Sequence, residues 1–385
     1  MLPSGPSGKG CGIGTVNGEF VLSLDILEEF HNPELCRKLL DQLSAELEGE
    51  LRFMEVCGTH TVAIFQSGLR SLLPEGIVHL SGPGCPVCVT HESEVNAFLD
   101  LAERDDVIIA TFGDLMRVPG HGGRNLKAAQ ADGARVNVIY SPFDALKLAA
   151  ENPDSTVVFL GVGFETTAPT IAGTMIMARQ QRLKNFRVLP FHKTVPEALA
   201  ALMDDVQTRI DGFILPGHVS AVIGLEPYRY IADKYQRSAI VTGFEPVDIL
   251  QSLLDMVRWR NEGTPKVTNN YTRIVADEGN KKAMSVMHQV FQPGDALWRG
   301  IGMIPGSGLD IREEWADMDA KREFGITIEE VPPLPGCKCG EVLKGIISPE
   351  QCPLFKKACT PAKPVGPCMV STEGSCAAYY KYKVD

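Results

Sequence analysis

The sequence predicts an α/β fold in which two similar Rossmann-like domains with mostly parallel sheets face a cleft, followed by a small cysteine-rich domain. The chain has 385 residues and is 44% hydrophobic, which is enough to build two or three domains with cores of their own. Short continuous apolar runs such as residues 107–111 alternate with helical patterns, as expected for parallel strands buried on both faces. Residues 109–114 and 118–121 also resemble residues 241–245 and 215–218, which indicates two units of similar plan.

Composition and spacing divide the chain into four parts. Residues 1–19 are expected to be a flexible lead, because they lack the charged and apolar regions of a secretory signal. We expect the first α/β domain at residues 20–134, the second at 135–263 and the cysteine-rich domain at 264–385.

Charge and cysteine content restrict the function classes. The net charge of −11 argues against a general nucleic-acid or anionic-membrane surface, and without 18 uninterrupted apolar residues no transmembrane helix is expected. Eleven cysteines in a chain that is not exported indicate metal and redox chemistry rather than a disulfide framework. The expected location is therefore the cytoplasm, with no membrane or nucleic-acid partner. We assign no role to Cys11 and Cys36.

The first domain is expected to begin with two helices in residues 22–47. The apolar strand 51–56 follows and ends at Cys57, and helical spacing over residues 61–73 places Cys57 and His60 at or just before a helix N-terminus. The positive end of the helix dipole and free backbone N–H groups favour a thiolate at Cys57.

Cys85 and Cys88 form a C-x-x-C motif after a predicted strand 77–80 and the turn 81–84. The motif is typical of a redox dithiol and equally of half a site for a soft metal, because both sulfurs can point at one atom. Two inert, buried cysteines are the third interpretation, although the turn glycines and proline make burial in a packed core unexpected. With Cys57 the thiols number three, which leaves a coordination position for an exogenous ligand, a substrate or a partner residue.

The remaining elements follow in order. Predicted helices span residues 92–103, 142–150, 170–180, 196–207, 246–261 and 281–291. Predicted strands span residues 107–111, 136–140, 157–161, 188–190, 212–216 and 239–242, and residues 299–309 are expected to be a glycine-rich strand and loop. The charged stretch 313–323 is expected to be a solvated surface helix.

Glu165 follows the predicted strand 157–161 within the run GFETT. A carboxylate at the C-terminal end of a parallel strand lies where α/β sheets place their sites. The alternative is an exposed acid in a turn.

The C-terminal stretch 337–376 concentrates sulfur. Its cysteines are Cys337, Cys339, Cys352, Cys359, Cys368 and Cys376. Five prolines among them leave little regular structure, so a metal or cluster is expected to hold the segment together. Four thiolates suit either a [4Fe–4S] cluster or zinc, and six allow a cluster plus a redox pair. The arrangement favours iron–sulfur over zinc, although its spacing matches neither bacterial ferredoxins nor zinc ribbons.

The runs FMEVCGTHT from Phe53, GPGCPVC from Gly82 and GFETT from Gly163, with the C-terminal cysteines, resemble the HypD family of hydrogenase maturation factors. The resemblance extends from about residue 20 to residue 382. It implies a [4Fe–4S] cluster with a neighbouring disulfide, in a domain similar to ferredoxin–thioredoxin reductase.

By that analogy the four cluster ligands are Cys337, Cys352, Cys359 and Cys376. The resemblance assigns Cys339 and Cys368 to the redox pair.

The family resemblance also implies a function. Together with a small HypC-type partner, and with a HypE-type protein as cyanide donor, such a chain holds an Fe(II) while it acquires cyanide and carbon monoxide. The iron group is then delivered to the large subunit of a [NiFe]-hydrogenase. Thiolates supply the electron density that low-spin iron with these ligands requires.

The resemblance gives the site residues their expected roles. Cys57 is the first choice for an iron ligand shared with a partner cysteine, and His60 is either a further ligand or a hydrogen-bond donor to one. Cys85 and Cys88 would bind the iron or exchange electrons with it, and electrons would reach them from the cluster through the redox pair. Glu165 belongs to a signature run of the family.

Two other functions are compatible with the sequence. The chain could be an iron–sulfur thiol-disulfide oxidoreductase of the ferredoxin–thioredoxin reductase type, in which Cys85 and Cys88 reduce a protein substrate and no iron is held in the cleft. It could also be an interaction module stabilised by zinc.

Overall fold

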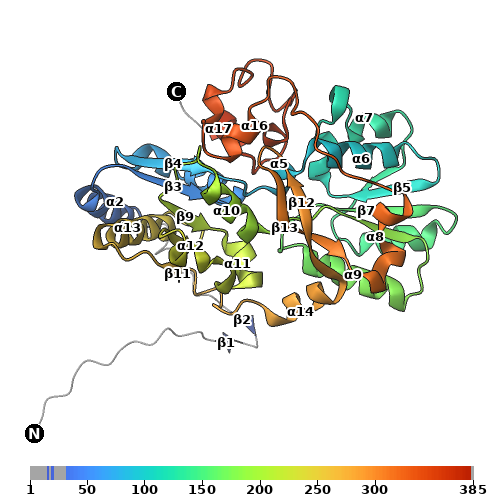
Figure 1. Cartoon of the computed structure of the whole chain (residues 1–385), viewed down its shortest axis with the longest axis horizontal. Helices are drawn as coiled ribbons and strands as arrows, with labels where there is room; N and C mark the ends of the chain where they lie inside the picture. Colours follow the sequence, from blue (N-terminus) through green and yellow to red (C-terminus); the bar gives the residue numbers. More distant parts are fainter. Residues whose placement is uncertain (1–14, 17–18, 21–31, 383–385) are drawn as a thin grey trace, which may run out of the picture.

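Two parallel sheets organise the chain. A computed structural model describes residues 15–16, 19–20 and 32–382 (Figure 1). The first sheet contains, in order, β11 (Val267–Asn269), β10 (Ser238–Val241), β9 (Gly212–Leu215), β3 (Leu51–Glu55) and β4 (Ile77–Ser81). The second contains, in order, β6 (Val136–Val138), β5 (Val107–Thr111), β7 (Thr156–Gly161) and β8 (Phe186–Pro190). All their pairings are parallel, as the continuous apolar runs predict.

Helices precede, connect and follow the parallel strands. They are α2 (Pro33–Glu46), α3 (Gly58–Gln66), α4 (Leu69–Leu72), α5 (Pro86–Val89), α6 (Glu92–Ala102), α7 (Leu126–Ala131), α8 (Asp144–Glu151), α9 (Ala168–Gln180), α10 (Val195–Asp204), α11 (Gly217–Ile223), α12 (Tyr230–Asp233), α13 (Pro246–Glu262), α14 (Lys281–Val290), α15 (Ala320–Glu323), α16 (Cys339–Leu343) and α17 (Ser375–Tyr382). No helix among the described residues is long and apolar enough to cross a membrane. The predicted helix before Asn32, Cys11 and most of the predicted lead 1–19 lie outside the described residues.

The strands group differently from the predicted ranges 20–134 and 135–263. The chain leaves the first sheet after β4, builds the whole second sheet from β5 to β8, and returns to the first sheet at β9. Phe53 of β3 lies opposite Gly212 of β9 as a result. An apolar run identifies a buried strand but not its neighbour, which explains why the sequence alone placed the division at residue 134.

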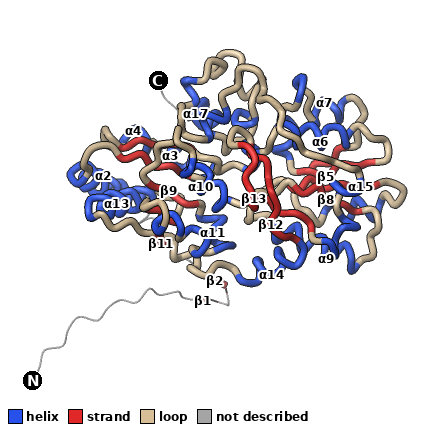
Figure 2. The backbone as a smooth tube through the Cα atoms, viewed as in Figure 1, coloured by secondary structure: helices blue, strands red, loops and turns tan. Residues whose placement is uncertain are grey.

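Each sheet has its own packed layers. In the first, Leu43 of α2 and Leu253 of α13 pack with Phe53 and Ile240 in one buried cluster. Figure 1 shows α2 and α13 side by side below β3 and β4, at the left of the view, with the second sheet at the right. Figure 2 shows the strands of both bodies as short red segments surrounded by helices.

An antiparallel hairpin stands between the two sheets (Figure 1). Its strands are β12 (Phe291–Trp298) and β13 (Gly302–Ile311), of which the sequence predicted only the second. Trp298 is fully buried and bridges to Thr90, and Lys193 bridges to Gly308, so the hairpin contacts the segments after β4 and β8.

Two local predictions need correction. The helix predicted over 61–73 begins earlier, at Gly58, and is broken at Gly68, whose φ of +71° is a left-handed conformation that glycine tolerates. The stretch 313–323 forms a 3₁₀ helix (Glu313–Met318) and α15, and it is not fully solvated because Trp315 and Met318 are buried. The prediction rested on the number of charged residues in this stretch and did not consider its two large apolar side chains.

The cysteine-rich C-terminal segment lies between the two α/β bodies, in red in Figure 1. Apart from α16 and α17 it contains short 3₁₀ turns at Pro349–Gln351 and Pro367–Met369, as its prolines predict. Helix α17 packs against α3, with the rings of Tyr379 and Phe65 4.6 Å apart. The 3₁₀ turn Pro367–Met369 packs against α5, which brings the tail to the C-x-x-C turn.

Candidate functional site: a buried group of thiols beside the end of β3

Sulfur atoms from two distant parts of the chain form one continuous series of contacts. The Sγ atoms of Cys85 and Cys88 lie 2.6 Å apart, and the Cys88 thiol also hydrogen bonds with that of Cys368. The Cys368 thiol in turn contacts that of Cys339, which contacts that of Cys337. All of these cysteines are free thiols in this structure. Five sulfurs thus lead from the C-x-x-C turn into the C-terminal segment.

A small cavity lies at the far end of this series. The cysteines that line it are Cys337, Cys339, Cys352, Cys359 and Cys376, together with Val342, Leu354, Phe355 and Met369. Gly366 also borders it, and a Cβ there would lie 2.6 Å from the Cys337 sulfur, so only glycine permits this close approach. Thiols on several sides of an apolar cavity fit the donor set of a [4Fe–4S] cluster.

No three or more His, Cys, Asp or Glu side chains within the described ranges are arranged around a single metal ion. The four thiolates of a [4Fe–4S] cluster bind four different iron atoms and need not converge on one point, so this finding does not conflict with a cluster.

The Cys85–Cys88 pair is buried, contrary to the sequence prediction. Cys85 is 4% exposed and Cys88 is fully buried, because the C-terminal segment covers the turn that carries them. Cys85 caps α5, and its sulfur accepts a hydrogen bond from the backbone N–H of Cys88 at 3.3 Å. The glycine-rich turn is covered by a tail that lies far from it in the sequence, so no local pattern reveals the burial.

Burial keeps most of these thiols protonated. It raises the pKa of Cys88 well above the ordinary value; the hydrogen bond with Cys368 lowers this pKa and the neighbouring Cys85 thiol raises it. Burial also raises the pKa of Cys376. At Cys337 the hydrogen bond with Cys339 raises the pKa most, and burial adds to it. A metal that binds here must displace these protons.

Cys57 lies where the sequence predicts, between β3 and the first turn of α3. The backbone N–H groups of His60 and Thr59 and the Thr59 side chain lie close enough to the Cys57 sulfur to favour its thiolate form, although the sulfur makes no capping hydrogen bond to α3. These donors lower its pKa, but burial outweighs them and raises the pKa to about 12. The expectation of a thiolate is therefore wrong for the chain without metal, because the sequence reveals the helix N-terminus but not the burial.

Two glycines join the Cys57 turn to the C-x-x-C turn. The backbone N–H of Gly58 donates to the carbonyl oxygen of Gly84 at 3.1 Å. A Cβ at Gly84 would lie 2.2 Å from the backbone nitrogen of Cys57. Since Gly84 directly precedes Cys85, this contact places Cys57 and Cys85 on adjoining backbone segments.

His60 has a ring nitrogen suited to binding a metal. Its Nε2 lies 2.9 Å from the carbonyl oxygen of Gly243, to which it must donate because a carbonyl only accepts. Burial lowers the pKa of His60 to about 4, so the ring is neutral and Nδ1 carries the lone pair. That buried Nδ1 has no hydrogen-bond partner.

A buried carboxylate that sequence reasoning missed supports the Cys57 turn. The Oε2 atom of Glu55 accepts the Cys57 backbone N–H at 3.1 Å, and its Oε1 accepts the Thr61 hydroxyl at 2.6 Å. The Nε2 atom of His79 lies 3.6 Å from Oε1. The signal was present in the sequence, because Glu55 is an acid two positions before the cysteine, in a strand that is apolar apart from Arg52.

Glu165 is buried and stands apart from the thiols. It is 2% exposed, so the exposed turn acid is excluded, and it follows β7 as predicted. Its Oε1 accepts the backbone N–H of Val195 at 2.9 Å, its Oε2 has no partner, and burial raises its pKa to about 8. Its electrostatic neighbours are Glu197 and Tyr228.

Buried ion pairs that sequence reasoning also missed flank the site. Lys193 donates to both carboxylate oxygens of Glu94, at 2.8 and 2.9 Å, and Arg299 pairs with Glu92. Arg299 lines a cavity that also includes Cys337, and it lowers the pKa of that thiol. The two partners of each pair lie on distant segments of the chain, so nothing local in the sequence reveals them.

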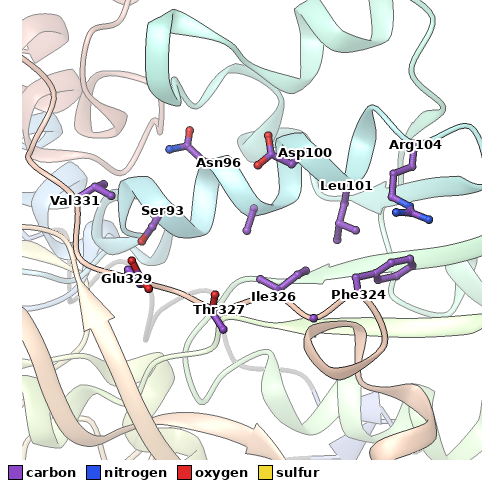
Figure 3. A pocket seen from close by; sticks show the side chains of 12 residues that line it. Ser93, Asn96, Asp100, Leu101, Arg104, Phe324, Ile326, Thr327, Glu329 and Val331 are labelled. Carbon is purple, nitrogen blue, oxygen red and sulfur yellow. The ribbon is translucent and has the colours of Figure 1, made fainter.

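Another hollow, of about 590 Å³, lies elsewhere on the described surface. It runs between α6 and the extended segment 324–331, where Figure 3 shows Asp100 and Arg104 on one side and Phe324 and Thr327 on the other. No cysteine or histidine lines it. Its chemistry does not resemble that of the thiol site.

Known proteins of one family are similar to this chain over nearly its whole length. The family model described as "HypD: Hydrogenase formation hypA family" matches residues 34–383. The hydrogenase maturation factor HypD of Rhodobacter capsulatus is 44% identical over 92% of this chain and 97% of its own length. The protein of that name from Escherichia coli (strain K12) is 44% identical over 93% and 98%, respectively. The hydrogenase expression/formation protein HupD of Azotobacter chroococcum mcd 1 is 43% identical over 92% and 96%.

Proposed function

The chain belongs to the HypD family and is a hydrogenase maturation factor, and from this premise we propose that it is a scaffold on which the Fe(CN)₂CO group of [NiFe]-hydrogenase is assembled. It would act in the cytoplasm with a HypC-type partner, receive cyanide from a HypE-type protein and pass the iron group to the hydrogenase large subunit. The iron group is cargo in this scheme.

The observation that carries the proposal is the junction of Cys57 with the series of thiols. The Gly58–Gly84 hydrogen bond holds the Cys57 turn against the Cys85 turn, and Cys88 contacts the C-terminal thiols. An iron held at this junction would be within reach of a dithiol that can donate or accept electrons.

We assign the iron to Cys57, with Cys85 and Cys88 as further ligands or as its redox partner. The neutral His60 offers Nδ1 as one more donor, because Gly243 fixes the proton on Nε2. A cysteine of the HypC-type partner would complete the coordination. The raised pKa of Cys57 means that iron must displace its proton, so the empty chain does not hold a reactive thiolate.

Cys337, Cys352, Cys359 and Cys376 would hold a [4Fe–4S] cluster in the cavity that they line. Such a cluster supplies single electrons at the potential that its surroundings set. The apolar side chains of the cavity would exclude water from it.

Cys339 and Cys368 would be the redox pair, and the sulfur contacts permit exchange with the C-x-x-C pair. In one direction, the Cys88 thiolate attacks Cys368 of a Cys339–Cys368 disulfide, the Cys88–Cys368 bond forms and Cys339 leaves as a thiolate. Cys85 then attacks Cys88, which forms the Cys85–Cys88 disulfide and releases Cys368. Two electrons and two protons have then moved from the C-x-x-C pair to the C-terminal pair, and the reverse sequence returns them.

Infrared spectroscopy of the chain, purified anaerobically with its HypC-type partner, tests the scaffold. We expect cyanide and carbonyl stretching bands, together with more iron than one cluster requires. Cys57→Ala should lose these bands and keep its acid-labile sulfide, whereas Cys36→Ala, on the half-buried side of α2, should keep both. Normal bands in the Cys57→Ala protein would overturn the assignment of Cys57. Cluster iron without bands in the unmodified chain would replace the scaffold by a thiol-disulfide oxidoreductase.

A further inference from the structure

A separate cavity of about 180 Å³ lies between β4 and the C-terminal segment. Its wall includes Arg52 and Arg70, His79 and Ser81 of β4, and Tyr379 of α17, and the segment 345–349 closes the other side. Of the described residues that line it, none is Asp or Glu. The cavity therefore collects cationic and hydrogen-bonding groups without a carboxylate to neutralise them.

Four buried polar atoms in this wall lack hydrogen-bond partners. They are Nε of Arg70, both ring nitrogens of His79 and Oγ of Ser81. His79 and Ser81 are only 8% and 6% exposed. Buried polar groups are nearly always paired, because an unpaired one has lost water without replacement. Four such atoms around one cavity indicate that a polar ligand belongs there.

The guanidinium of Arg70 is already fixed in place. Its Nη2 donates to the Tyr379 hydroxyl at 2.9 Å, and its central carbon lies 4.6 Å from the centre of the Tyr379 ring and 5.2 Å from that of Phe65. A guanidinium held in this way loses little rotational freedom when it binds an anion.

Three acids lie near the wall of the cavity: Glu50, Glu55 and Glu350, of which Glu350 acts electrostatically on the Tyr379 hydroxyl. Glu50 contacts Nη1 of Arg52 at 3.4 Å, on the solvent side. Glu55 approaches His79 from the opposite side at 3.6 Å, which is too long for a hydrogen bond, and its two oxygens already accept hydrogen bonds from the Cys57 turn. Nε of Arg70 makes no hydrogen bond and therefore remains available to a ligand.

We propose that this cavity binds a small oxyanion, whose oxygens share a negative charge and accept hydrogen bonds from Arg70 and Ser81. The volume holds a ligand of a few non-hydrogen atoms, such as a short carboxylate, bicarbonate or inorganic phosphate. His79 would complete the binding as a donor through whichever ring nitrogen carries a proton. The inference rests on the cavity alone and does not depend on the proposed iron chemistry.

The location gives the ligand two neighbours. Through His79 and Glu55 it lies two side chains from the backbone N–H of Cys57, and through Tyr379 it contacts α17, the helix that contains Cys376. A bound anion would therefore join β4 to the C-terminal segment.

Isothermal titration calorimetry of the full chain, under anaerobic conditions, tests the proposal. Sodium formate, sodium bicarbonate and sodium phosphate are titrated separately at constant ionic strength set with sodium chloride. We expect saturable binding of at least one anion, and the arm with the lowest Kd identifies the carboxylate, carbonate or phosphate class. Removing one hydrogen bond to the anion by Ser81→Ala should raise that Kd roughly ten- to a hundredfold.

Two further variants separate a built site from general charge attraction. Arg70→Lys keeps the charge but removes Nε, and should weaken binding by a similar factor. Arg229→Gln removes an exposed guanidinium that pairs with Glu226 and does not line the cavity, so it should leave the Kd unchanged. Urea midpoints in chloride buffer confirm that each variant is folded. The proposal is wrong if no anion binds saturably, if Ser81→Ala binds as tightly as the unmodified chain, or if Arg229→Gln weakens binding as much as Arg70→Lys.

Discussion

Replacing Gly84 with alanine should separate the two turns that form the candidate iron site. A Cβ at this position would lie 2.2 Å from the Cys57 nitrogen, 2.3 Å from the Val56 carbonyl carbon and 2.5 Å from the Cys57 Cα. All three atoms are backbone, so no side chain can rotate away.

To accommodate this Cβ, the backbone of Gly84 and that of Val56 and Cys57 would have to move apart by a large distance for a packed interior. Ordinary van der Waals contact begins at 3.4 Å, whereas the shortest of these contacts would be only 2.2 Å, so the two backbone segments must move apart. The Gly58–Gly84 hydrogen bond, 3.1 Å long, spans the same gap and would be lost or distorted. Overpacking of this kind costs about 1–3 kcal/mol of folding free energy.

Urea unfolding and alkylation together report the effect. We expect a lower unfolding midpoint for Gly84→Ala and faster iodoacetamide labelling of Cys57, measured by mass spectrometry, because the thiol loses its cover. Gly173→Ala is the matched control, since its Cβ would meet nothing within 4 Å in the middle of α9. There, alanine should raise the free energy of unfolding by about 0.5–1 kcal/mol.

A Gly84→Ala protein as stable as the unmodified chain, with Cys57 equally protected and iron bound normally, would refute this reasoning. It would mean that the two turns can part without consequence. Loss of stability in both alanine variants would instead indicate a general sensitivity to substitution.

Three further predictions concern other buried groups. Lys193→Met leaves the Glu94 carboxylate buried without its cation and should lower the free energy of unfolding by about 3–5 kcal/mol. Adding Glu94→Gln should recover most of that loss. If the losses of the two substitutions simply add in urea unfolding, the ion pair does not stabilise the fold. Glu165 has a folded-state pKa of about 8, above its unfolded value, so the native state binds the extra proton between those values and stability falls as pH rises through this window. The free energy of unfolding of Glu165→Gln, relative to that of the unmodified chain, should therefore be higher at pH 8.5 than at pH 5. The same difference between the two proteins at both pH values would contradict the raised pKa. Cys368→Ser should prevent thiol-disulfide exchange between the C-terminal pair and Cys85–Cys88, while Cys36→Ser should not. Differential alkylation under a glutathione redox buffer measures the fraction of Cys85 and Cys88 that is oxidised in each variant.

Local features of the fold were predictable because each strand carries its own signal. The run that forms β5 is continuously apolar, as a strand covered on both faces must be, and every residue in it is buried. Which strands pair was not predictable, since β9 joins β3 only after the chain has built the whole second sheet. The fully buried Trp298 likewise shows that the hairpin packs on segments whose contacts no local pattern encodes.

The same distinction applies to the site. Cys57 at a helix N-terminus and the C-x-x-C turn follow from spacing over a short stretch of sequence. The burial of Cys88 and its contact with Cys368 depend on the C-terminal segment, at the other end of the chain, so the sequence predicted an exposed pair. The roles of Cys339 and Cys368 in exchange came from family resemblance and stay a prediction, although their thiols are in contact.

Burial of the thiols has a chemical consequence for assembly. A protonated thiol is a poor nucleophile and a poor metal ligand, so Cys57 and Cys88 are unreactive while the chain is empty. A cation that reaches them replaces the proton and stabilises the thiolate, so reactivity appears only together with the cargo. Because the C-terminal segment provides the burial, its closure over the C-x-x-C turn would keep the site inactive until the proposed iron binds.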